Sequence, residues 1–189
     1  MEPDLDKLIY LDAEYISRKY EEIKQVSPGN TFTKQEGASA GIRVPLLNAG
    51  VHTQESRTFT VSSRKMLMEL WQDLNKNYQS FDAAGFKNNQ GTRILWMKGI
   101  LTLAEWKMNN EPGYEFYQLD HGSESTAFLT HKEYFAAGFT EVLEASVALK
   151  GNVAIPVKCL VRVMWHVDIA KNYTACPYLI VEDTEIKPS

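Results

Sequence analysis

The most regular pattern in the sequence is a run near its end in which apolar and other residues alternate. The apolar members all carry odd numbers: Val153, Ile155, Val157, Cys159, Val161, Val163, Trp165 and Val167. A period of two is that of a β-strand with one buried face. A straight strand over residues 153–167 would extend ~50 Å, whereas a compact chain of this length has a radius of gyration of ~16 Å. We therefore expect this strand to bend, bulge or break.

Two further strands are predicted in the first third of the chain, each followed by a helix. Residues 8–11 are apolar and end at Asp12, a good N-cap for a helix of about three turns. Residues 57–62 alternate as a half-buried strand does. Ser63 then caps a helix whose apolar stripe consists of Met66, Leu67, Leu70, Trp71, Leu74 and Tyr78.

The remaining elements are less regular. Residues 93–106 are rich in Ile, Leu and Trp, and Gly99 indicates a bulge or a bend between two strands. Thr130 and Glu133 form a capping box that predicts a helix running through Phe139. Residues 140–149 fit either a helix or a strand, and residues 178–181 predict a last strand.

These elements predict one domain over residues 1–189 of the α+β class. We expect a bent, mostly antiparallel sheet with about three helices packed on one face, because short turns join consecutive strands as often as helices do. Residues 28–56 contain glycines and small polar side chains, and we expect them to form a long loop or a loosely paired hairpin.

The charge balance argues against nucleic acid as a partner. The chain has 20 Lys and Arg against 24 Asp and Glu, a net charge of −4. The sequence contains neither a secretory signal nor an apolar run long enough to cross a membrane, so we expect a cytoplasmic protein without a membrane partner. Two cysteines, Cys159 and Cys176, are too few for a disulfide framework. Cys159 is expected to be a buried core residue.

No motif predicts catalysis, a metal or a cofactor. Residues 37–41 spell G-x-S-x-G, but Pro45 follows where a nucleophile elbow needs a helix. Carboxylates and imidazoles gather at Asp120, His121, Glu124 and His131 without the spacing of a known metal site. His52 and Glu55 lie close together, as such pairs often do by chance. We therefore predict no catalytic residue, no metal ligand and no cofactor.

Ligand binding is assigned to the even-numbered face of the alternating run. Lys158, Arg162 and His166 lie there with apolar residues between them, and Asp168 reduces the positive charge of the same face. Cations ~13 Å apart on one strand could hold an elongated anion. An ordinary solvent-facing sheet surface remains the alternative, and the partner expected is an unknown protein or a small anionic ligand. The sequence also leaves open whether the chain forms a homo-oligomer.

The start of the chain resembles a bacterial family of unknown function. The resemblance covers residues 8–75: a Tyr-Leu-Asp start (residues 10–12) before a helix, then a polar Gly-Ser-rich stretch, then a strand leading into a Leu-rich helix. It implies a bacterial or phage context and a shared fold, and no chemistry.

Two functional classes follow. The first is a non-catalytic binding or sensing module, which the absence of a catalytic constellation and three aromatics expected to be exposed, Tyr114, Phe116 and Tyr117, both favour. The second is a small enzyme of unfamiliar type, in which the fold would assemble acid-base residues from Asp12, His52, Glu55 and His166.

Overall fold

The computed structural model describes residues 3–25, 61–87, 91–106, 114–136, 138–139, 141, 153–167 and 172–185. Its strands are β1 (Leu8–Leu11), β2 (Arg93–Trp106), β3 (Tyr114–His121), β4 (Glu124–Phe128), β5 (Ile155–Val167) and β6 (Asn172–Glu182). Its α-helices are α1 (Ala13–Lys24), α2 (Val61–Asn77) and α3 (Ala83–Lys87), and two short 3₁₀ turns are η1 (Leu5–Lys7) and η2 (Lys132–Tyr134).

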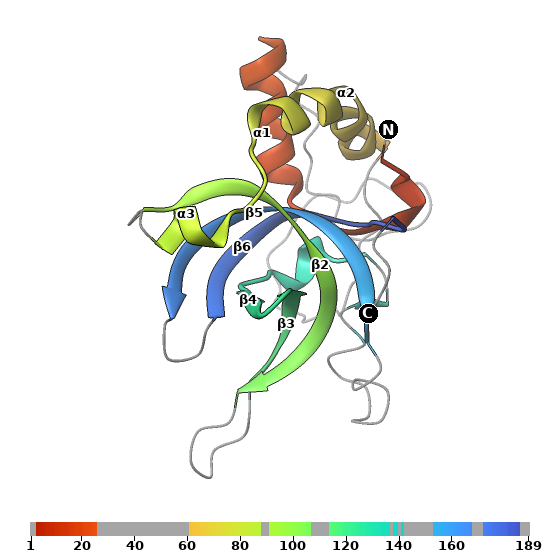
Figure 1. Ribbon diagram of the computed structural model, residues 1–189. Helices are drawn as coiled ribbons and strands as arrows, with labels where there is room; N and C mark the ends of the chain where they lie inside the picture. Colours follow the sequence, from red (N-terminus) through yellow and green to blue (C-terminus); the bar gives the residue numbers. More distant parts are fainter. Residues whose placement is uncertain are drawn as a thin grey trace, which may run out of the picture.

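Five of the strands close into a barrel. The order is β6-β4-β3-β2-β5, and β5 pairs with β6 to complete the ring. All these pairings are antiparallel except β4–β6, which is parallel. The sixth strand, β1, lies outside the ring and pairs with the C-terminal half of β6. Figure 1 shows the long, curved strands β2, β5 and β6 with α1 and α2 above them.

The predicted fold class is therefore wrong in its architecture. The sheet is a closed barrel, not an open bent sheet with about three helices on one face, and among the described residues only α1 and α2 reach seven residues. The prediction omitted the β3–β4 hairpin, whose turn at Gly122 has a φ of 69°. Without this hairpin, nothing links β2 to β6, and the ring cannot be inferred.

The elements near the start agree in part with the sequence. Residues 8–11 form β1, and the Asp12 carboxylate accepts a hydrogen bond from the Tyr15 amide at 2.9 Å to cap α1. The strand predicted over residues 57–62 is wrong at its end, because Val61 and Ser62 already belong to α2. Residues 57–60 lie outside the described part.

Residues 93–106 form one strand, not two. Gly99 marks a close approach of backbones: a Cβ atom built there would lie 2.2 Å from the Asp120 carbonyl oxygen. β2 pairs with β5 on one side of this point and with β3 on the other, sharing Ile100 and Leu101 between them. Glycine is needed because any side chain would collide with β3.

The helix predicted from Thr130 and Glu133 is also wrong. Residues 132–134 form a single 3₁₀ turn whose N-cap, His131, makes no side-chain capping bond. Phe135 is instead extended and forms a β-bridge with Tyr10, and their rings pack edge to face at 4.9 Å. Burial of this aromatic residue in the barrel overrides the local capping signal.

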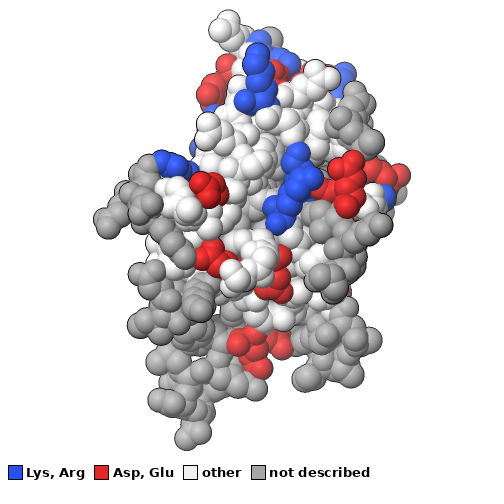
Figure 2. Space-filling view, viewed as in Figure 1, with Lys and Arg blue, Asp and Glu red and all other residues white. Residues whose placement is uncertain are grey.

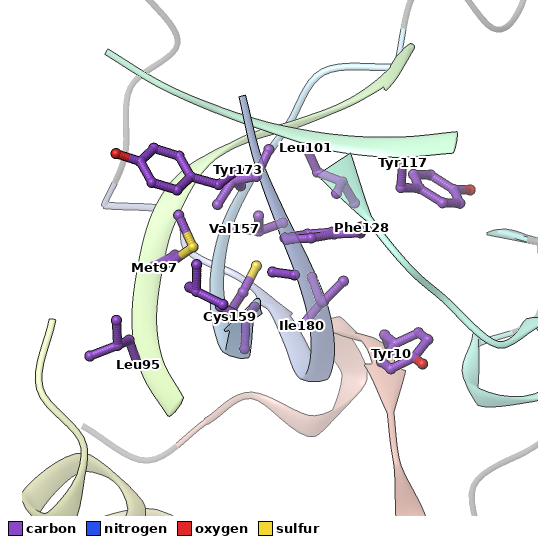
Figure 3. Packing of buried hydrophobic residues seen from close by; sticks show 14 of the residues in the cluster. Tyr10, Leu95, Met97, Leu101, Tyr117, Phe128, Val157, Cys159, Tyr173 and Ile180 are labelled. Atoms are coloured by element: carbon purple, nitrogen blue, oxygen red, sulfur yellow. The ribbon is translucent and has the colours of Figure 1, made fainter. Parts of the chain in front are cut away.

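Two hydrophobic cores share the barrel wall. The inner core fills the barrel with side chains that include Leu101, Tyr117, Val157, Cys159 and Ile180, some of which Figure 3 shows pointing toward one another. Burial of Cys159 is confirmed, whereas the exposure expected for Tyr117 is wrong, because it is fully buried. Phe116 is half-buried.

The outer core lies between the barrel and the helices. Leu67, Leu70 and Leu74 of α2 pack there against Leu160 of β5 and Leu179 of β6. The helices therefore cover the wall formed by β1, β5 and β6, together with Trp96 of β2.

Several sequence predictions fall on residues that the structure does not describe. These are the 28–56 loop, the G-x-S-x-G stretch, His52, Glu55, Asp168 and most of residues 140–149. Within the described segments, no helix has both the length and the apolar character that a membrane span requires.

Candidate functional site

A bulge in β5 separates the three residues predicted to bind a ligand. Val163 pairs with Ala175 and Trp165 pairs with Thr174, so Met164 is an extra residue on β5. One extra residue reverses the faces to which the following side chains point. The bend or bulge expected from the length of the run is confirmed. It reverses the side of the sheet to which each later side chain of β5 points.

His166 consequently points into the barrel. It lies opposite Tyr173, a fully buried residue of the inner core, and the two ring centroids are 4.4 Å apart. Trp165 takes the outer face and is 49% exposed. The expectation that His166 shares a face with Lys158 and Arg162 is wrong, because the period-two rule holds only up to Met164.

Lys158 and Arg162 both keep the outer face but do not form one continuous surface. Leu160 lies between them on β5 and is fully buried under the helices in the outer core. Arg162 lies opposite Ile94 of β2 and Cys176 of β6. Its Nε atom is buried and, within the described segments, has no hydrogen-bond partner. Ligand binding by Lys158 and by Arg162 must therefore be considered separately.

Lys158 lies in a groove of about 810 Å³ between the C-terminal part of α2 and the barrel wall. We call this feature the Lys158 groove. Its basic residues are Lys7, Lys76, Lys98 and Lys158, and its acidic residues are Asp4, Glu182, Asp183 and Glu185. In Figure 2, basic and acidic side chains lie next to each other below the helices, where β2 and β5 pass beneath them. The volume is in the range of pockets that hold small molecules.

Three contacts fix the ammonium group of Lys158. Its Nζ atom lies 4.3 Å from the ring centroid of Trp96 and 5.3 Å from that of Trp71, distances typical of cation–π interactions. It also donates a hydrogen bond to the side-chain oxygen of Asn75. Asn75 in turn donates to the Trp71 carbonyl at 2.7 Å, and Trp96 donates to the Leu74 carbonyl at 3.1 Å. The contacts are therefore held in place by α2.

A second lysine lies directly across the sheet. Lys98 of β2 pairs in register with Lys158 of β5, and like charges opposite each other destabilise a sheet. Lys98 is neutralised by Asp183, whose Oδ2 atom is 2.7 Å from its Nζ atom. Lys158 has no carboxylate within ion-pair distance among the described residues. Of these two adjacent cations, only Lys98 therefore has a carboxylate at ion-pair distance within the described residues.

The electrostatics of the groove follow from these positions. Burial lowers the pKa of Lys158, and the charge of Lys98 lowers it further, against the opposite effect of Asp183 and Glu185. Burial alone would raise the pKa of Asp183, but the hydrogen bond from Lys98 holds it below its usual value. The net effect on Lys158 is a lowered pKa, so its ammonium is less stable than that of a lysine in water.

The residues considered for a metal are arranged for other roles. His121 points into the barrel, where its Nε2 atom lies 2.8 Å from the Thr126 hydroxyl, while His131 is exposed. Burial lowers the pKa of His121. No group of three potential metal-ligating side chains occurs in the described part of the chain.

Of the acid-base residues proposed for an enzyme, the structure describes Asp12 and His166, and it does not bring these two together. The Asp12 amide bonds to the Tyr178 carbonyl, whereas His166 lies opposite Tyr173. Tyr173 and Tyr178 are five positions apart along β6, a distance of roughly 16 Å. The Asp12 carboxylate is also occupied as the cap of α1.

The sequence alone did not identify Trp71, Asn75, Lys98 and Asp183 as members of the site. One signal was available: Lys98 is the only charged residue between Arg93 and Glu105 in an otherwise apolar strand. Its partnership with Lys158 depends on the β2–β5 register, which no local pattern contains.

No protein-family model, no curated protein and no solved structure matches the chain.

Proposed function

We propose that the protein is a binding module of a bacterial or phage protein, and that a small anionic ligand binds in the Lys158 groove. One observation carries the proposal: a half-buried ammonium lies in a groove beside a second lysine, with no carboxylate at ion-pair distance within the described residues. A ligand carboxylate or phosphate would supply the missing negative charge.

The surroundings of Lys158 favour a small ligand. Trp71 offers an apolar wall, Asn75 and Lys76 offer hydrogen-bond donors, and the acidic residues of the groove restrict where a negative group can lie. Because α2 and two paired strands hold these side chains, binding needs little reorganisation.

Titration calorimetry with oxalate at low ionic strength tests the proposal. Lys158→Met should weaken oxalate binding at least about tenfold, equivalent to about 1.4 kcal/mol. Lys65→Met removes an exposed lysine of α2 that does not line the groove, and it should leave the affinity unchanged. Affinity of the wild type should also fall as salt is added.

Equal weakening by both substitutions would indicate a general charge effect and would contradict a site at Lys158. An unchanged affinity in Lys158→Met would contradict it as well. Circular dichroism of both variants verifies that each is folded.

A further inference from the structure

We propose that Lys158 is a reactive amine, and that the ligand of the groove is a 2-oxo acid whose carbonyl carbon forms a reversible imine with its Nζ atom. This inference rests on the proposed function, since it specifies the ligand that the same groove binds. The geometry that carries it is the position of one lysine opposite another, over two indole rings, in a groove of small-molecule size.

The first requirement is a neutral amine, because an ammonium has no lone pair with which to attack. A lysine becomes nucleophilic near neutral pH when it is desolvated or lies next to another cation. Lys158 meets both conditions, being half-buried and directly opposite Lys98. Asp183 favours the Lys158 ammonium, but its close ion pair, at 2.7 Å, is with Lys98.

The charged groups that line the groove with Lys158 come from several elements, and they include Asp4 before η1 and Glu182 at the end of β6. Lys98 lies on β2, Lys76 on α2 and Lys7 on η1, while Asp183 and Glu185 follow β6. Of these, Lys98 disfavours the charge of Lys158, and Asp183 and Glu185 favour it. The indole rings and Asn75 also favour a cation at this position.

The reaction balances without another reagent. The ammonium first releases one proton to solvent, the neutral Nζ atom adds to the carbonyl carbon, and a proton moves from nitrogen to the carbonyl oxygen to give a hydroxyl. This hydroxyl takes up one proton from solvent and leaves as water while the C–N double bond forms, so that ammonium and ketone give protonated imine and water. The product is a protonated imine, so the positive charge remains at the place where Trp96 and Trp71 now contact the ammonium. The ligand carboxylate would be held by the nearby lysine ammoniums, of which Lys76 is in the groove without an ion pair among the described residues.

Reductive trapping tests the inference. The protein is incubated at pH 7 with pyruvate and sodium cyanoborohydride, which reduces an imine to a stable secondary amine, and the labelled lysines are mapped by mass spectrometry. Labelling at Lys158 should exceed that at Lys65, an exposed lysine of α2, at least about tenfold. Lactate carries the same carboxylate but has a hydroxyl in place of the ketone. It should therefore compete with pyruvate and give no adduct.

Two variants separate this inference from the proposed function. Lys158→Arg keeps the cation but cannot form an imine, so it should bind oxalate and give no adduct in the groove. Lys98→Met removes the neighbouring cation and frees Asp183, so the pKa of Lys158 should rise and its labelling at pH 7 should slow about three- to tenfold.

Labelling that is spread over exposed lysines, or that is absent from Lys158, would contradict the proposal that Lys158 forms an imine. If oxalate still bound to the wild type but not to Lys158→Met in that case, the groove would remain an anion site and only the carbonyl chemistry would be wrong. If oxalate did not bind, both proposals would fail.

Discussion

The two faces of β5 differ in burial and in the residues that they carry. Val157, Cys159, Val161 and Val163 point inward and are fully buried, whereas Lys158 and Arg162 point outward and are only partly covered. These four inward residues are apolar and lie where barrel closure excludes water. The outward face carries two cations, Lys158 and Arg162, that folding alone does not require.

The largest expected effect comes from introducing a charge on the inward face. Cys159→Asp should lower the free energy of unfolding by about 3 to 5 kcal/mol, because an unpaired carboxylate would be buried among valines. Chemical denaturation followed by tryptophan fluorescence measures the change. Lys158→Met, one residue away on the outward face, should change stability by less than about 1 kcal/mol. Similar losses in both variants would contradict the contrast between the faces.

A smaller effect is expected at Gly99, where β2 and β3 approach closely. Gly99→Ala should destabilise the protein by about 1 to 3 kcal/mol, because its Cβ atom would meet the Asp120 carbonyl and force β2 away from β3. Gly91→Ala is the matched control, since no atom lies within 4 Å of the Cβ position there. Thermal unfolding compares the two, and an equal melting temperature for both would show that β2 and β3 do not approach as described.

The smallest effect concerns His121, a half-buried histidine that points into the barrel. Burial lowers the pKa of folded His121 below its usual 6.5, against the opposing charges of Glu124 and Asp120. As the pH falls below about 6.5, the unfolded chain binds a proton that the folded state resists, so stability is lost until the folded pKa is reached. The loss should be small, because the charges of Glu124 and Asp120 oppose the effect of burial. It should disappear in His121→Gln and persist in the exposed control His131→Gln, as measured by denaturation between pH 7.5 and 5. Persistence of the loss in His121→Gln would contradict this assignment.

The sequence predicted the inward face of β5 more accurately than the outward face. Alternation identified the inward residues of β5 correctly up to Val163, because burial on one face imposes a period of two. It failed at His166, since a bulge at Met164 leaves no mark in the residue pattern. Lys158 was identified as a ligand-binding candidate, and this assignment stays a prediction.

Barrel closure and the composition of the groove could not be predicted. Both depend on pairings between distant segments, such as Thr126 with Tyr173 in parallel and Lys98 with Lys158 in antiparallel register. Local propensity carries no information about which strands meet. The capping box at Thr130 illustrates the same limit, because packing of Phe135 against Tyr10 decided the structure there.

NMR of lysine side chains tests most directly whether ligands bind on the outward face of β5. With ¹³C,¹⁵N-labelled lysine, addition of oxalate should shift the Cε and Nζ signals of Lys158 and raise the pKa of this side chain, because a bound anion stabilises the ammonium. The signals of Lys65 should not move. Unchanged Lys158 signals, together with shifts of the inward-facing His121 and His166 rings, would place the ligand inside the barrel and contradict the assignment to the Lys158 groove.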